Sequence, residues 1–168
     1  MANPTLDATV GGSASNSYVT RAAAQTYFDG RTGADAWTNA IDADSDRALM
    51  MATRRLEQET YHGVIRSLDQ ALQWPRAGLV DPDGRLIDPD SIPTFLANAT
   101  CELALALLAG DFDLSDTGLE GFEDVSLGPL RATPRSGHPA GTLPQEVQRW
   151  LGPYWRHAGA FMGTIERA

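Results

Sequence analysis

The sequence predicts a mainly α-helical protein: a small bundle of about four helices with an extended, partly β arm and a flexible C-terminal tail. Three observations support this class. Helical patterns with start and stop signals fill the chain up to residue 110, a Gly- and Pro-rich stretch follows, and a short helical pattern resumes near residue 144. We therefore divide the chain into four parts, namely a flexible N-terminal lead (1–16), a helical core (17–110), the arm (111–143) and a final helix with its tail (144–168).

The first helix is expected over residues 21–29, because Thr20 is a favourable N-cap and Gly30 is a common stop. A helical turn is expected within "GADAWTNA". A second helix, capped by Asp44 or Ser45, is expected to run to about residue 60. Its apolar residues recur at helical spacing, which predicts one buried face.

The strongest helical pattern is "SIPTFLANATCELALALLAGD". Pro93 suits the first helical position and Gly110 suits the C-terminal cap. Apolar residues surround this helix on nearly all sides, which predicts a central position in the bundle. Within it, Cys101 is expected to be a small buried apolar residue, because a nucleophilic thiol needs exposed, electropositive surroundings. Glu102 is expected at a solvated or subunit-facing position.

The arm contains one alternating piece, "DVSLGPLRA", which is expected to pair as a strand or hairpin. A stretch of this length without a helix is uncommon in a compact domain and is often functional. The final helix is expected in "LPQEVQRWLGPYWRH", with Val147, Trp150 and Leu151 on one face and Pro153 interrupting it.

Charge and composition exclude several classes of protein. The net charge is -9, and all 13 basic residues are arginine, so the phosphate backbone of a nucleic acid would be repelled. A single cysteine excludes an intrachain disulfide. The N-terminus lacks the pattern of a signal peptide, and the longest apolar run, "LALALLA", is too short to cross a bilayer. We expect a soluble protein with no membrane partner.

The segment "LQWPRAGLVDPDGRLIDPDSIP", residues 72–93, is rich in aspartate and raises the possibility of calcium. If Gly84 takes the sixth position of an EF-hand loop, the first ligand position falls on Leu79, which has no oxygen ligand in its side chain. A turn at "DPDG" is favoured, because Pro82 restricts φ and Gly84 accepts a positive φ.

No catalytic, metal-binding or cofactor-binding residue is expected. His62, His138 and His157 are scattered, and no phosphate-binding loop or nucleophile elbow is present. The four tryptophans could stack on single-stranded bases, but core or interface positions are favoured, because stacking platforms normally lie in positively charged grooves.

The order of these segments resembles the head-tail connector (adaptor) proteins of long-tailed phages and phage-like gene transfer agents. The resemblance covers about residues 16–110 and is carried by "NSYVT", "GADAW", "ALMMATRRLE", "ALQWPRAGL", "DGRLID" and "IPTFLANATCELALALLAG". It continues more loosely through "VSLGPLRA" and "LPQEVQRWL". Similar sequences are also labelled DnaT-like single-stranded-DNA-binding proteins, which stays open as the alternative.

The connector resemblance implies a non-enzymatic virion protein, assembled in the host cytoplasm and located in the neck. About twelve copies would form a ring beneath the portal and above a stopper or tail-completion protein, with DNA passing through the lumen without specific binding. Candidate contacts with subunits or partners are the tryptophans and charged residues that flank the turn and the last helix, namely Trp74, Arg76, Asp81, Asp83, Arg85, Arg149, Trp150 and Trp155. A third hypothesis, a calcium-dependent domain, depends only on the aspartates of the 72–93 segment.

Overall fold

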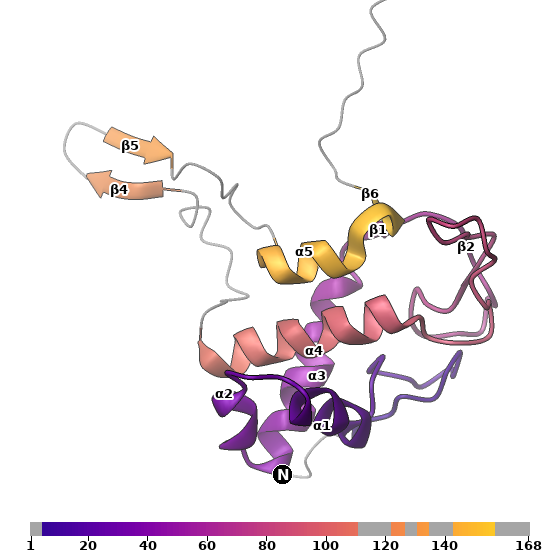
Figure 1. The fold of residues 1–168 in the computed structure, drawn as a ribbon, viewed down its shortest axis with the longest axis horizontal. Coiled ribbons are helices and arrows are strands. Elements are labelled where there is room, and N and C mark those ends of the chain that lie inside the picture. Colours follow the sequence, from indigo (N-terminus) through magenta and orange to yellow (C-terminus); the bar gives the residue numbers. More distant parts are fainter. Residues whose placement is uncertain (1–4, 111–121, 127–130, 135–142, 157–168) are drawn as a thin grey trace, which may run out of the picture.

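The computed structural model describes residues 5–110, 122–126, 131–134 and 143–156 (Figure 1). The described part contains five α-helices: α1 (Arg21–Asp29), α2 (Asp35–Thr38), α3 (Asp42–Leu56), α4 (Thr94–Ala109) and α5 (Gln145–Leu151). A short 3-10 helix, η1 (Gly152–Tyr154), follows α5. The mainly α-helical class predicted from the sequence is confirmed.

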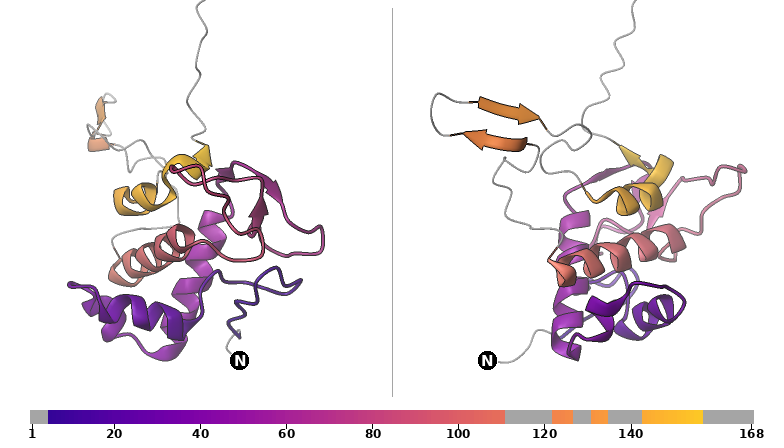
Figure 2. Two further views of the ribbon diagram at one scale, coloured as in Figure 1. Left: turned by 45° about the vertical axis from the view of Figure 1, so that its right-hand side comes forward. Right: turned by 60° about the vertical axis from the view of Figure 1, so that its left-hand side comes forward.

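Helix α4 is the centre of the bundle, as its all-round apolar sequence predicts. It contacts α1, α2, α3 and α5. In Figures 1 and 2, α5 packs along one side of α4, α1 and α2 lie on the other, and α3 crosses it. The core consists of apolar side chains from all of these helices, including Phe28, Trp37, Leu49, Leu56, Leu96, Leu103, Val147 and Leu151. None of the described helices is both long and apolar enough to cross a membrane.

The ends of α1 and α4 follow local capping signals. The Thr20 side chain accepts a hydrogen bond from the Ala23 amide at 3.1 Å, and α1 stops at Gly30, as predicted. Gly110 ends α4 in the left-handed conformation with φ of 75°. Pro93 takes the N-cap position of α4, one residue before the position predicted for it.

Helix α3 differs from the prediction at both ends. Its N-cap is Ile41, so neither Asp44 nor Ser45 caps it. Asp42 and Asp44 instead lie in the first turn, where carboxylates interact favourably with the positive end of the helix dipole. The helix ends at Leu56, before the predicted residue 60, and the Tyr61 hydroxyl donates to the Leu56 carbonyl at 2.9 Å. The Leu56 carbonyl also accepts the Glu59 amide at 3.1 Å, so Tyr61 gives this carbonyl at the helix end a second donor.

The described strands form three antiparallel two-stranded pairs. Strand β1 (Thr60–Tyr61) pairs with β6 (Trp155–Arg156), and β2 (Val64–Ile65) pairs with β3 (Arg76–Ala77). In the arm, β4 (Phe122–Ser126) pairs with β5 (Arg131–Pro134), which confirms the hairpin predicted around "DVSLGPLRA". The β1–β6 pair connects the segment after α3 to the segment after α5.

Residues 5–16, which we expected to be a flexible lead, form a hydrogen-bonded loop in the structure. The backbone amide of Asp7 donates to Asn16 Oδ1 at 2.8 Å, and the Asn16 amide donates to the Asp7 carbonyl at 2.8 Å. The Gly12 carbonyl accepts from the Ala71 amide at 3.0 Å, which connects this loop to the segment before α4. The predicted C-terminal tail beyond residue 156 lies outside the described residues.

Candidate interaction surface

Residues 60–87, here called the loop module, connect α3 towards α4 through β1, β2 and β3. Its inner side is anchored by Trp74, which is 1% exposed and precedes a cis peptide bond to Pro75. The indole packs edge-on against Tyr61 at 5.6 Å and against Phe95 at 5.5 Å between ring centroids. The buried rings of Trp74 and Tyr61, packed with the partly buried ring of Phe95, fix this side of the module to the helical core.

Partly buried hydrogen bonds hold the same inner side. The Glu57 carboxylate accepts the Gln73 amide at 3.0 Å and the Tyr18 hydroxyl. Burial raises the pKa of Glu57, although these hydrogen bonds act in the opposite direction. The Gln70 carboxamide donates to the Leu72 carbonyl at 2.6 Å. The backbone of the loop module is therefore braced against the end of α3.

The loop module exposes several large apolar side chains among its polar ones. Five side chains of this segment stand in solvent and form what we call the apolar patch: Val64, Ile65, Leu68, Val80 and Leu86. Leu68 is 98% exposed and Leu86 is 81% exposed. Exposed apolar groups gathered on one segment mark sites of protein interaction.

The turn at "DPDG" closes the hairpin that carries Val80 and Leu86, as predicted. The Gly84 amide donates to the Asp81 carbonyl at 2.9 Å, and Gly84 has a φ of +80°. The Asp81 carboxylate accepts the Arg85 amide at 2.8 Å, a bond that lowers the pKa of Asp81. The Arg85 guanidinium bonds Asp81 at 2.8 Å and Asp83 at 2.7 Å. In the described part of the chain, no group of three or more His, Cys, Asp or Glu is placed to hold a metal ion.

Two substitutions separate a turn from a calcium site. Gly84→Val should destabilise the protein by about 1–3 kcal/mol, because a β-branched residue is strained at positive φ. Asp83→Asn should change stability by less than about 0.5 kcal/mol, because Asp83 is exposed and its ion pair is solvated. Melting temperatures with and without millimolar calcium measure both effects. A calcium-dependent rise that Asp83→Asn removes would contradict the assignment of this segment as a turn.

Most arginines in the described part already have a carboxylate partner. The structure describes nine arginine side chains, and seven of them form ion pairs: Arg21, Arg31, Arg47, Arg55, Arg66, Arg85 and Arg149. Arg76 instead donates to the His62 carbonyl at 2.8 Å and the Gly63 carbonyl at 2.9 Å. A phosphate backbone would therefore have to displace carboxylates from most of these guanidinium groups.

The four tryptophans do not form a platform. Trp37, Trp74 and Trp155 are 3%, 1% and 9% exposed, whereas Trp150 is 38% exposed. Trp74 and Trp155 both belong to the core, so neither side chain is on the surface of the single chain, and their contact with a partner stays a prediction. In the core, the Trp155 indole Nε1 donates a hydrogen bond to Glu59 Oε2 at 2.8 Å. On α5, Val147 and Leu151 are buried, but Trp150 faces outward, which corrects the single apolar face predicted for this helix.

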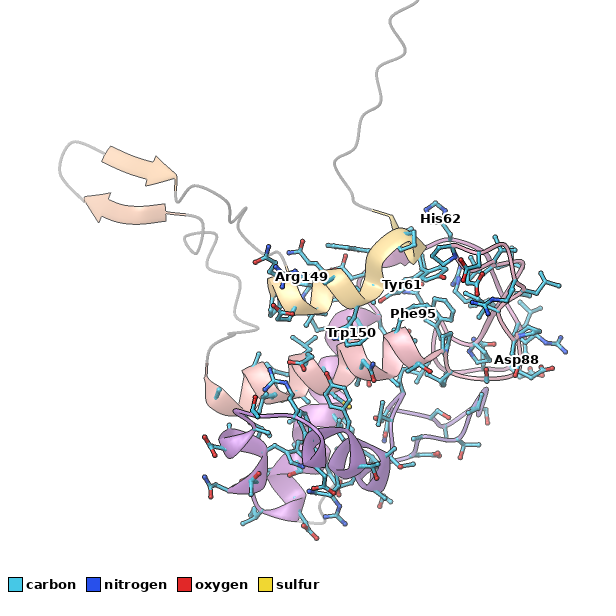
Figure 3. The ribbon with its side chains drawn as sticks, viewed as in Figure 1. Tyr61, His62, Asp88, Phe95, Arg149 and Trp150 are labelled. Atoms are coloured by element: carbon cyan, nitrogen blue, oxygen red, sulfur yellow. The ribbon has the colours of Figure 1, made fainter. Side chains whose placement is uncertain are left out.

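The remaining candidate residues lie in two separate places. Arg76, Asp81, Asp83 and Arg85 belong to the loop module or its turn, whereas Arg149 and Trp150 lie on α5. Figure 3 shows Asp88, just beyond the module, and Arg149 towards opposite ends of the molecule. The apolar patch was not predicted from the sequence. The one sequence feature that could have indicated this patch is an isolated apolar residue among polar ones, such as Leu68 in "IRSLDQ".

Comparison with known proteins identifies one family. A family model described as "Putative DnaT-like ssDNA binding protein" matches residues 5–168. The chain belongs to this family. Searches of curated proteins and of solved structures found no match, and no comparison identified a head-tail connector. The match to the DnaT-like family covers the helical core, the arm and the C-terminal segment.

Proposed function

We propose that this DnaT-like family member is a structural head-tail connector protein, which joins a DNA-filled phage head to its neck and tail. In this role it assembles into a ring between the portal and the stopper and lets DNA pass. The observation that carries the proposal is the loop module, whose buried inner anchors hold the apolar patch in solvent. Large apolar side chains exposed on a folded loop favour a protein partner, because burying them on binding is favourable.

Electrostatics supports a role in which DNA passes without being held. The chain has a net charge of -9, and most described arginines are paired with carboxylates. A ring of such subunits would present a negative lumen, which repels phosphate and weakens contact with moving DNA. The proposal is therefore a protein that contacts proteins and encloses DNA.

Single-stranded-DNA binding is the second candidate. It is favoured by the family description and by Trp150 and Arg149, which lie next to each other on the exposed side of α5. An exposed indole beside a guanidinium group can stack on a base and contact its phosphate. The Arg149 guanidinium, however, bonds Glu146 at 2.6 Å. A base-stacking site here would have one aromatic ring and one cation that is already neutralised.

Salt dependence separates the two functions. Self-association, measured by sedimentation velocity, should be stronger in about 500 mM than in about 50 mM NaCl, because salt screens the repulsion between acidic subunits. Fluorescence titration with a labelled oligonucleotide at about 50 mM salt should detect no binding.

Two outcomes would contradict the connector proposal. One is oligonucleotide binding that weakens steeply with salt and is lost in Trp150→Ala. The other is the absence of the protein from the neck of purified particles. Trp150→Ala is a suitable probe because the side chain is exposed, so its removal should leave the fold intact.

A further inference from the structure

Strand β2 of the loop module is exposed on both of its faces. Val64 and Ile65 are 64% and 42% exposed. Consecutive residues of a strand point to opposite faces, so these two side chains leave neither face of β2 covered. Two adjacent large apolar side chains in solvent are unfavourable, and burying them against another segment would stabilise the protein.

The backbone of β2 is paired on one side. In the described part of the chain, β2 and β3 form a two-stranded sheet, with Val64 opposite Ala77 and Ile65 opposite Arg76. The other side of β2 is therefore an edge of this sheet. Proteins usually cover or block an apolar edge strand, because its free N–H and C=O groups can pair with another chain. An edge of this kind accepts an added extended segment.

The C-terminal segment of the chain begins close to this strand. Strand β6 ends at Arg156, which pairs with Thr60 of β1 (Figure 1). Thr60 in turn precedes Val64 by four residues. Paired residues of an antiparallel sheet have Cα atoms about 5 Å apart, and four residues of extended chain span at most about 14 Å. Arg156 therefore lies within about 20 Å of Val64.

The chain beyond β6 has the length and the composition to cover β2. Residues 157–168 read "HAGAFMGTIERA" and contain three large apolar side chains, namely Phe161, Met162 and Ile165. The nine residues from Arg156 to Ile165 can span about 30 Å, which is longer than the distance to Val64. Because β6 is antiparallel to β1, the chain leaves β6 in the direction away from β2 and has to reverse, and Gly159 suits such a turn.

Charge and connectivity favour this segment over a second copy of the protein. The segment contains one acidic and one basic residue, Glu166 and Arg167, whereas a second copy would bring a net charge of -9 to an equally acidic chain. A segment joined to the same chain also acts at an effective concentration in the millimolar range. The family match extends through this segment to residue 168, so the segment belongs to the sequence pattern of the family.

We propose that residues 157–168 fold back over β2 of the same copy and pack their apolar side chains against Val64 and Ile65. The occupant of the β2 edge is then the C-terminal segment of the chain itself. A protein partner that binds this part of the apolar patch must first displace the segment, so the segment is an autoinhibitory cover that limits association of free subunits. This consequence rests on the proposed connector function, whereas the contact with β2 does not.

Hydrogen exchange of the full-length chain, followed by mass spectrometry, tests the contact. Phe161→Asp combined with Ile165→Asp should speed exchange of the amides of residues 62–66 by about ten-fold, because the covered state is lost. The control, Glu166→Gln combined with Arg167→Gln, changes polar residues of the same segment and should exchange like the wild type. Exchange within α4 should be the same in all three proteins, which shows that the fold is intact. Equal exchange of residues 62–66 in the wild type and the aspartate variant would overturn the contact.

Dilution identifies which copy supplies the segment. Protection of residues 62–66 should be the same at about 50 μM and about 0.5 μM protein, because a contact within one chain does not depend on concentration. Protection that is lost on dilution would overturn the assignment to the same copy.

Two further measurements separate the contact from its role. The aspartate variant, with β2 uncovered, should self-associate more strongly than the wild type in about 500 mM NaCl, and equal association would overturn the autoinhibitory role. Oligonucleotide binding by both proteins would contradict the connector function and leave the contact with β2 in place. Equal hydrogen exchange would remove the contact and leave the connector function in place.

Discussion

Gly63→Ala should destabilise the protein by about 2–5 kcal/mol, because the substitution meets two separate penalties. Gly63 has a φ of +75°, where an L-residue costs about 1–2 kcal/mol. A Cβ atom there would lie 2.7 Å from the Ala77 carbonyl oxygen and 2.8 Å from Leu79 Cγ. Forcing these groups apart adds roughly 1–3 kcal/mol, the usual cost of overpacking. Urea unfolding at equilibrium measures the total.

Gly78→Ala is the matched control. Gly78 has a φ of +77°, but no atom lies within 4 Å of the position that its Cβ would take. It should therefore show only the dihedral cost, about 1–2 kcal/mol. If both variants lost the same free energy of unfolding, the backbone segments at Gly63 and Ala77 would have to move apart at no cost in stability.

Gly63→Ala should also weaken self-association more than Gly78→Ala does. Leu79, which the new Cβ would displace, is the inner residue of the hairpin that presents Val80. Displacing Leu79 moves the hairpin tip relative to α4. Sedimentation velocity at a temperature where both variants are folded separates this effect from global unfolding.

The parts of the fold that the sequence predicted correctly are those decided by neighbouring residues. Thr20 and Gly30 define α1, and Gly110 ends α4, because a cap acts within one turn of its helix. The end of α3 could not be predicted in this way. It coincides with a hydrogen bond from Tyr61, whose position depends on the tertiary packing of β1 against β6.

The candidate surface was harder to predict, because a residue type does not reveal which way its side chain faces. Trp74 next to Arg76 has the composition of an interface, but its partners Tyr61 and Phe95 enclose it in the core. Conversely, Leu86 resembles a core residue but faces solvent. The strands of the loop module are two residues long, too short for an alternating pattern to distinguish inner from outer positions.

Glu102 shows the same difficulty for a charged residue. It was expected at a solvated or subunit-facing position on an otherwise apolar helix, yet its side chain is only 9% exposed. Its partner Arg31 is 71 residues away in the sequence, after α1. No local pattern connects two residues at that separation, so the pair could be found only from the structure.

Arg31→Met should destabilise the protein by about 3 kcal/mol. This value is the lower end of the range for breaking a buried ion pair, and we use it because 30% of the Arg31 side chain is exposed. The guanidinium bonds Glu102 through two atoms, at 2.6 Å from Nε and 2.9 Å from Nη2. The Tyr27 hydroxyl donates to the same carboxylate at 2.5 Å. Without Arg31, the carboxylate would be left buried with the tyrosine as its remaining side-chain partner.

A double substitution tests whether the stability lost in Arg31→Met comes from the Glu102 carboxylate that is left without a cation. Arg31→Met combined with Glu102→Leu should recover most of the lost stability, since apolar residues can replace a buried pair at little cost. The control is Arg149→Met, whose partner Glu146 is 58% exposed, and it should cost less than about 1 kcal/mol. If Arg31→Met lowers the free energy of unfolding no more than Arg149→Met does, water screens the Arg31–Glu102 ion pair.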